Sequence, residues 1–169
     1  GFILLGMMSY KLMSEGTLFF YLIIYLITTF GIFAVILNLR TVDGEVIKIS
    51  DLNGLRFTSR PKAIALLVFL FSLAGIPPFA GFFAKFFILS ASVNEGLYLL
   101  SIIAVISSVI AAFYYLSVIK NMFFNESKTE LLLDNNKISS VVFIVSALFV
   151  TLFFFYPDPL IDLVDILFS

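Results

Sequence analysis

The chain has 169 residues, of which 62% are hydrophobic and only 12% are charged, and its mean hydropathy is +1.15. A soluble domain of this size carries about 25% charged residues to face water, so the composition predicts that lipid solvates much of the exterior. The net charge of −1 excludes the basic face that nucleic-acid binding needs. Because Cys and His are absent, disulfides are excluded and metal ligands are scarce, so we expect neither nucleic acid nor metal to bind.

The first part of the chain contains one uninterrupted apolar run of membrane-spanning length. A helix needs about 20 apolar residues to cross a hydrocarbon core of roughly 30 Å. Residues 1–8 are too few and predict only the end of a helix, whereas residues 18–39 carry no charge and predict a spanning helix. Residues 40–62 hold eight charged side chains and predict a polar loop, with a short interfacial turn over residues 47–55.

The rest of the chain contains three further apolar segments. The first, residues 63–92, is interrupted at residues 75–78, and neither part alone is long enough to cross, so we expect one discontinuous helix. Residues 97–119 predict another span. A polar loop over residues 121–137 then leads to a last span over residues 138–156.

These segments predict an all-α fold, a polytopic transmembrane helix bundle with about four full spans and a partial N-terminal one. The bundle covers residues 1–157, and residues 158–169 form an interfacial tail with a short amphipathic helix. Lys and Arg concentrate in loops on the cytoplasmic side of membrane proteins. We therefore expect the basic segments 40–62 and 120–137 on the cytoplasmic or matrix side, and the C-terminus on the opposite side.

Lys85 is the only ionisable residue inside a predicted span. A lysine within a membrane helix costs at least about 2.5 kcal/mol on insertion scales, and such residues usually face a bundle interior or a water-filled cavity. The alternative is snorkelling, in which the aliphatic stem lies along the helix and the ammonium reaches the headgroups. Apolar residues flank Lys85 for a full turn or more on both sides, which weakens that alternative.

The predicted helix break lies directly before this lysine. Pro77 and Pro78 lack the amide hydrogens that would bond the carbonyls of Leu73 and Ala74. Backbone freed in this way is tolerated at membrane depth only where it is buried in protein or lines a hydrated cavity. Taken alone, the break is equally consistent with a proline kink that serves helix packing.

The spacing brings the lysine and the break together. Lys85 lies four residues after Gly81 and seven after Pro78, so the three share one helical face. Helical side chains lean toward the N-terminus, so the ammonium is predicted to pass over Gly81 toward the freed carbonyls. A lysine in such a place can accept and release a proton. The sequence therefore predicts a proton relay at Lys85, and the residues expected to shape the break are Gly75, Pro77, Pro78 and Gly81.

A narrow stripe of small and partly polar residues follows one face of residues 97–119. It repeats at three- and four-residue spacing and comprises Ser101, Ala104, Ser108, Ala111 and Tyr115. Its polar members, Ser101, Ser108 and Tyr115, are candidates for a polar path that continues from Lys85. Close helix packing through small residues explains the stripe equally well. Thr28 and Thr29 are expected to bond their own backbone.

The broken segment also carries a recognisable pattern. Residues 72–78 read SLAGIPP, and Gly81-Phe82 and Lys85-Phe86 follow. This pattern resembles the broken helix of NADH dehydrogenase subunit 2, an antiporter-like membrane subunit of respiratory complex I. Sister subunits and cation/proton antiporters often carry an acidic residue at or beside the lysine, so Lys85 followed by Phe86 favours subunit 2. Matches in the same order are Gly1-Phe2, Leu4-Leu5, Tyr25-Leu26, Gly31, Phe33 and Tyr114-Tyr115-Leu116.

The resemblance implies that the chain is the C-terminal part of that subunit, as a split half or as a piece of it, with the family's broken-helix lysine at Lys85. It implies a non-redox subunit of a proton-translocating NADH:ubiquinone reductase. Flavin, iron–sulfur clusters and quinone are then expected on other subunits, with no cofactor on this chain. The implied partners are other complex I membrane subunits, including the chain that supplies the upstream helices, and lipids. The implied location is the mitochondrial inner membrane or, alternatively, a bacterial cytoplasmic membrane.

Two other functions stay open at this point. A subunit of a cation/proton antiporter would transport without NADH. A purely structural membrane subunit would pair Lys85 with a lipid phosphate or a partner carboxylate. The position of the Lys85 ammonium separates these possibilities, because contacts at headgroup level favour a structural role and polar neighbours at mid-membrane favour transport.

Overall fold

The computed structural model describes residues 1–9, 15–41, 44–126, 131–133, 136–153 and 155. The predicted all-α helix bundle with one discontinuous helix is confirmed. The helices are α1 (Phe2–Met8), α2 (Glu15–Leu37), α3 (Leu55–Thr58), α4 (Arg60–Ala74), α5 (Ala80–Asn94), α6 (Tyr98–Phe124) and α7 (Lys137–Leu152), with a 3-10 turn at Ile49–Leu52. Three short strands complete the described part, β1 (Leu39–Thr41), β2 (Gly44–Glu45) and β3 (Leu131–Leu133).

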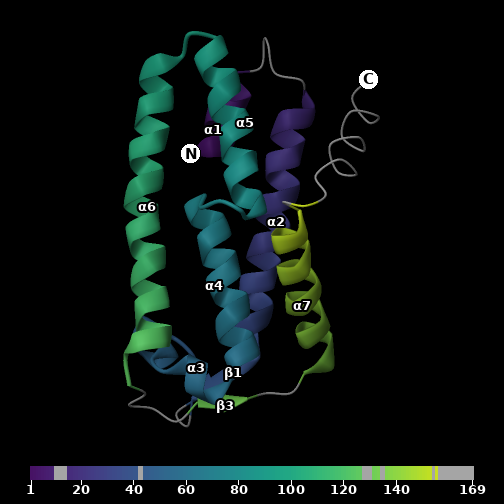
Figure 1. Ribbon diagram of the computed structural model, residues 1–169, viewed down its shortest axis with the longest axis vertical. Helices are drawn as coiled ribbons and strands as arrows, with labels where there is room; N and C mark the ends of the chain where they lie inside the picture. The colour runs from purple at the N-terminus through teal and green to yellow at the C-terminus, as the bar shows by residue number, and fades with distance from the viewer. Residues whose placement is uncertain (10–14, 42–43, 127–130, 134–135, 154, 156–169) are drawn as a thin grey trace.

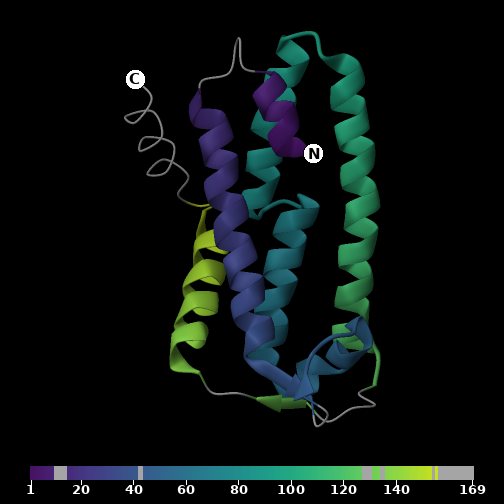
Figure 2. The same ribbon diagram turned by 180° about the vertical axis from the view of Figure 1, so that it is seen from behind.

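The helices form an elongated bundle around the two halves of the broken helix. In Figure 1, α4 and α5 follow one another along the long axis, with α6 on one side and α7 beside the α4 half. Figure 2 shows that α2 covers the opposite face, and that α1 lies beside α5. Helix α2 contacts both halves of the broken helix as well as α7, so it joins the parts of the bundle.

Among the residues that the structure describes, two helices, α2 and α6, are long and apolar enough to cross a membrane, and α5 and α7 are shorter apolar helices. At 1.5 Å per residue, the 27 residues of α6 extend about 40 Å. Helix α7 begins where the Asn136 side chain accepts a hydrogen bond from the Ile138 amide at 3.0 Å. It ends at Leu152, and the predicted interfacial tail over residues 158–169 lies outside the described residues.

The break in the central helix falls where it was predicted. Gly75 ends α4 in the left-handed region at φ +83°, a conformation that glycine adopts without steric cost. Its amide donates to the carbonyls of Phe71 and Ser72 at 3.1 and 3.0 Å. The peptide between Pro77 and Pro78 is cis, and α5 begins two residues later.

The predicted loop over residues 40–62 is wrong in part. Strand β1 pairs antiparallel with both β2 and β3, so the two basic connections lie at one end of the bundle. Pro61 occupies the first turn of α4, where its fixed φ favours a helix start, so α4 begins earlier than predicted. Lys62 is therefore helical and only 6% exposed, and its ammonium donates to the Asn38 carbonyl beyond the end of α2 at 2.9 Å.

The connection before α3 is ordered by one carboxylate. Asp51 accepts hydrogen bonds from the amides of Lys48 and Ile47 at 2.8 and 3.1 Å. These bonds favour the charged form, so the Lys48 amide first and the Ile47 amide second lower the pKa of Asp51. The predicted interfacial turn over residues 47–55 is thus present as a 3-10 turn that leads into α3.

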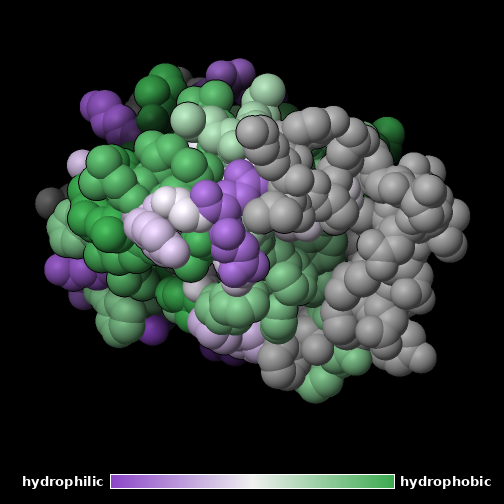
Figure 3. Space-filling view, turned by 90° about the horizontal axis from the view of Figure 1, so that it is seen from above, coloured by the Kyte–Doolittle hydropathy of each residue, from purple (hydrophilic) through white to green (hydrophobic). Residues whose placement is uncertain are grey.

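Apolar surface covers much of the exterior, as lipid solvation requires. Large hydrophobic side chains on α6 are exposed along its length, among them Leu99, Val109 and Phe113. Figure 3 looks down on the end that carries the connection between α5 and α6, where apolar residues dominate the described surface around small hydrophilic groups. The composition therefore reflects an apolar outer face in addition to a buried core.

The core between α2 and α4 depends on one close approach. Phe69 of α4 is fully buried, and its ring lies against Gly31 of α2 so closely that a Cβ at Gly31 would overlap it. Leu66 and Val35, which are 2% and 0% exposed, continue this packing toward the basic end.

The Gly31 contact yields a prediction for stability. Gly31→Ala places a methyl group so that it overlaps the tip of the buried Phe69 ring, and overpacking of this kind costs about 1–3 kcal/mol. We expect a lower thermal midpoint for the membrane complex that contains the chain. Adding Phe69→Leu to Gly31→Ala removes the overlapping ring and should recover part of the loss. If Gly31→Ala alone leaves the midpoint unchanged, the close packing of α2 on α4 is contradicted.

Candidate functional site

The Lys85 ammonium lies at the break between α4 and α5. Its Nζ donates to the carbonyls of Leu73 and Ala74 at 2.7 and 3.3 Å and to the Ser108 hydroxyl of α6 at 2.7 Å. The prediction that the ammonium reaches the carbonyls freed by the prolines is confirmed. The Lys85 ammonium points back into the bundle, whereas the snorkelling alternative would place it among the headgroups.

The three acceptors of this ammonium are all uncharged. Leu73 and Ala74 supply main-chain carbonyls that residues 77 and 78, as prolines, cannot bond. The remaining contact is aromatic, with Nζ 5.1 Å from the ring centre of Phe2 on α1. Carbonyl dipoles and the ring face therefore stabilise the cation, and no carboxylate is among these partners.

The path of the lysine stem differs from the prediction. A Cβ placed at Gly81 would overlap the main chain and the hydroxyl of Ser72, and its nearest neighbours do not include Lys85. The stem passes Gly75 instead, where a Cβ would lie 3.1 Å from Lys85 Cδ. Gly81 has another role: its amide donates to the Ser72 hydroxyl at 3.0 Å and joins the two half-helices.

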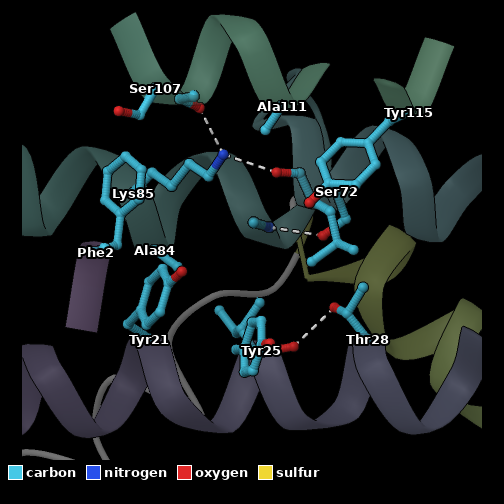
Figure 4. Close-up of a pocket in the computed structure, with 15 residues that line it drawn as sticks. Phe2, Tyr21, Tyr25, Thr28, Ser72, Ala84, Lys85, Ser107, Ala111 and Tyr115 are labelled. Atoms are coloured by element: carbon cyan, nitrogen blue, oxygen red, sulfur yellow. Dashed lines mark hydrogen bonds between the residues drawn. The ribbon is translucent and has the colours of Figure 1, made fainter. Parts of the chain in front are cut away.

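A cavity of about 190 Å³ adjoins the ammonium. Figure 4 shows its wall, with Lys85 between α6 and the end of α4, and with the side chains of α2 on the opposite side. A single water needs only about 10–15 Å³ of such space, so the cavity can hold several. Its polar lining comprises Tyr21, Tyr25, Thr28, Ser72, Ser107, Ser108 and Tyr115.

Sequence reasoning missed the contribution of α2 to this wall. Tyr21, Tyr25 and Thr28 are spaced four and three residues apart, which puts them on one helical face. The rings of Tyr21 and Tyr25 stack with centroids 6.2 Å apart. The Thr28 hydroxyl donates to the Ile24 carbonyl at 2.7 Å, which confirms the expected bond to its own backbone. The three- and four-residue spacing of these hydroxyls in the sequence could have predicted a polar face on α2.

The predicted stripe on α6 divides between two environments. Ser108, Ala111 and Tyr115 line the cavity. Ser101 lies elsewhere: it is 5% exposed, its hydroxyl lies 2.5 Å from that of Ser92, and it also donates to the Leu97 carbonyl. The structure thus brings Ser108 and Tyr115 to Lys85 and places Ser101 in the packing of α5 on α6. Their roles in a proton path stay predictions.

This arrangement can exchange a proton between the amine and the cavity. Charged Lys85 donates three hydrogen bonds to fixed acceptors. After losing a proton, the neutral amine still has two hydrogens to donate to the two carbonyls and gains a lone pair, which the Ser108 hydroxyl can satisfy by reversing its bond. Both forms therefore find partners without movement of the backbone.

Fold and site define a polytopic membrane protein whose broken helix holds a buried lysine beside a small polar cavity. The sequence model described as "NADH:quinone oxidoreductase/Mrp antiporter, TM" matches residues 1–111. The chain belongs to this family, and the resemblance that the broken-helix motif indicated is confirmed.

Curated relatives agree with this assignment. NADH-quinone oxidoreductase subunit N of Rhodospirillum rubrum is 42% identical over 162 residues, which cover 96% of this chain and 33% of the relative. NADH-ubiquinone oxidoreductase chain 2 of Oenothera berteroana is 39% identical over 163 residues, which cover 95% of this chain and 33% of the relative. The chain thus spans about a third of the length of these relatives.

A solved structure shows the same fold. A chain of respiratory complex I from Thermus thermophilus with bound aureothin superposes with a TM-score of 0.81 at 22% sequence identity. The match covers 95% of this chain and 36% of that chain. The fold of this chain is therefore shared with one chain of a solved respiratory complex.

The junction between the half-helices yields a second stability prediction. Gly81→Ala forces a methyl group into the Ser72 main chain, which cannot rotate away, so α5 must move from α4. Gly96→Ala is the matched control, because a Cβ there meets open space and costs only backbone strain at φ +76°, about 1–2 kcal/mol. We expect the thermal midpoint of the membrane complex to fall further for Gly81→Ala than for Gly96→Ala. Equal effects would contradict the tight junction.

Proposed function

We propose that the chain is part of an antiporter-like subunit of a proton-translocating NADH:quinone oxidoreductase, and that Lys85 relays protons within it. The single observation that carries the proposal is the Lys85 ammonium, held by neutral acceptors beside a polar cavity at the helix break. Redox chemistry takes place on other subunits, which hold the flavin, iron–sulfur clusters and quinone. The names of the relatives support this assignment.

The neutral surroundings of Lys85 suit a relay. A carboxylate in contact with the ammonium would hold its proton, whereas carbonyls and a hydroxyl stabilise the cation less strongly. A change of charge elsewhere in the complex can then shift the balance between the two protonation states of Lys85. Protons enter or leave through water in the cavity, and the hydroxyls of Ser108 and Tyr115 orient that water.

The family assignment and the charge distribution suggest the setting. The chain would lie in a mitochondrial inner membrane or a bacterial cytoplasmic membrane, in contact with other membrane subunits and with the segment that supplies the upstream helices. Its basic end, where β1 pairs with β3, would face the matrix or cytoplasm, because Arg and Lys concentrate on that side.

Replacement of Lys85 tests the relay. A group that transfers protons typically contributes 10²–10⁴-fold to the rate of its step. In the assembled complex, Lys85→Ala should slow proton transfer through this subunit by about 100-fold or more, so fewer protons move per NADH oxidised. NADH:quinone turnover should be retained better than pumping. The measurement compares proton uptake and NADH oxidation in sealed vesicles.

Lys120→Ala is the matched control, because it removes an exposed lysine of α6 at the basic end. It should leave the proton stoichiometry unchanged. An unchanged stoichiometry in Lys85→Ala would overturn the relay and leave a structural role for Lys85. The family also includes Mrp-type antiporters, so cation-driven proton transport in the absence of NADH would favour that second function.

A further inference from the structure

A second cavity lies at the basic end of the bundle, away from Lys85. It has a volume of about 440 Å³ and lies between the start of α4, the short helix α3 and the end of α6. Its lining consists of Arg56, Phe57, Arg60, Ile64 and Phe123. Two guanidinium groups thus share one cavity with two aromatic rings and an aliphatic side chain.

The arginines of this cavity have unused hydrogen-bonding capacity. The Nε atom of Arg56 is buried and has no hydrogen-bond partner, and its Cζ lies 4.3 Å from the centre of the Phe57 ring. Neither Arg56 nor Arg60 makes an ion pair within the part of the chain that the structure describes. A buried donor without a partner is destabilising. The site therefore favours an anion with several acceptor oxygens, and phosphate matches the planar fork of guanidinium donors.

An apolar groove lies next to this cavity and runs along the bundle. It has a volume of about 320 Å³ and runs between α4 and α7. Ile64 lines both the cavity and the groove, so the two lie on either side of this one side chain of α4. Figure 1 shows α4 between α6 and α7, which places the cavity toward one neighbour and the groove toward the other.

The lining of the groove is apolar throughout. Its one hydroxyl, that of Thr151, is already bonded to the Ala147 carbonyl at 2.8 Å. No unused donor or acceptor in the lining is therefore available to a polar ligand, whereas a hydrocarbon chain fits. The walls of the groove include Ile64, Ala65 and Val68 of α4 and Ile144, Ala147 and Leu148 of α7.

The length of the groove matches one membrane leaflet. From Phe143 to Leu152 the groove follows nine residue steps of α7, about 14 Å at 1.5 Å per residue. Half of a hydrocarbon core of roughly 30 Å is about 15 Å. The arginines lie at the basic end of the bundle, so a ligand with its charge there would extend its apolar part toward the middle of the membrane.

From this combination we propose that the chain binds one anionic phospholipid. The phosphate lies between Arg56 and Arg60, and one acyl chain lies over Ile64 in the groove between α4 and α7. Basic pockets between membrane helices on the cytoplasmic or matrix side are suited to such headgroups. A free phosphate would use the arginines and leave the groove empty, whereas an apolar groove next to a cationic cavity points to an amphiphile. The lipid would also tie α7 to α4 and so brace the half-helix that ends at the Lys85 site.

The experiment counts bound lipid on the whole membrane complex. The complex is delipidated in mild detergent and exposed to phosphatidylcholine vesicles that contain deuterated phosphatidylglycerol, and the retained lipid is measured by native mass spectrometry. Arg56→Gln combined with Arg60→Gln should remove one labelled molecule per complex. Each basic residue near a membrane surface contributes about fivefold to binding, so the half-saturating phosphatidylglycerol fraction should rise about twenty-fivefold.

Two further variants and one further probe decide the outcome. Lys48→Gln removes an exposed cation outside the cavity and should change nothing, whereas Ala147→Phe fills the groove and should release the lipid with both arginines intact. Retention of the labelled lipid by both the double arginine variant and Ala147→Phe would overturn the proposal. So would equal retention of phosphatidylcholine, or binding of inorganic phosphate without lipid. Lipid counts do not depend on pumping, so this test is independent of the relay assigned to Lys85.

Discussion

The contact between the Lys85 ammonium and the carbonyls of Leu73 and Ala74 is the constraint on which the rest of the structure depends. In hydrocarbon, neither partner is tolerable alone: a cation without hydrogen bonds and carbonyls without donors each cost several kcal/mol. Together they satisfy one another at 2.7 and 3.3 Å. The helix break and the lysine therefore stabilise each other, and a change to either leaves the other without its partner.

The bundle around this contact combines rigid packing with a polar opening. The close approach of Gly81 to Ser72 fixes the half-helices relative to each other, and Gly31 against Phe69 fixes α2 on α4. Toward the basic end from the break, the α2–α4 interface is apolar as far as the buried bond between Lys62 and Asn38. The cavity at Lys85 is thus bounded toward the basic end by apolar packing. The lysine is held in place by main-chain carbonyls, and its amine can exchange a proton with the Ser108 hydroxyl or the cavity.

Much of the fold was predictable because lipid leaves few alternatives for a backbone. Charge-free runs predicted α2 and α6, and Pro77-Pro78 predicted the break, because a missing amide hydrogen has the same consequence in any environment. The start of α4 and the pairing of β1 with β3 were not predicted. Both depend on contacts between distant segments: Lys62 reaches Asn38, and residues 39–41 pair with residues 131–133. A search of the sequence for charged residues places both the start of α4 and these strands in polar loops.

The candidate site was predictable to the same extent. The position of the ammonium followed from proline chemistry and from the lean of helical side chains, which are local properties. The stem passes Gly75 and not Gly81 because Gly81 is already filled by the approach of Ser72, a tertiary contact with no sequence signature. Likewise Ser101 and Ser108 belong to one stripe, yet only Ser108 faces the cavity, since α5 lies against the other end of that stripe.

The surroundings of the Lys85 nitrogen in the membrane-embedded complex test the central claim most directly. A cryo-electron microscopy map that resolves ordered water would locate this atom. The account predicts that Nζ lies at the break, within hydrogen-bonding distance of the Leu73 carbonyl and the Ser108 hydroxyl, with water in the adjoining cavity. An ammonium that instead contacts lipid phosphates, in front of a dry and closed interior, would contradict it.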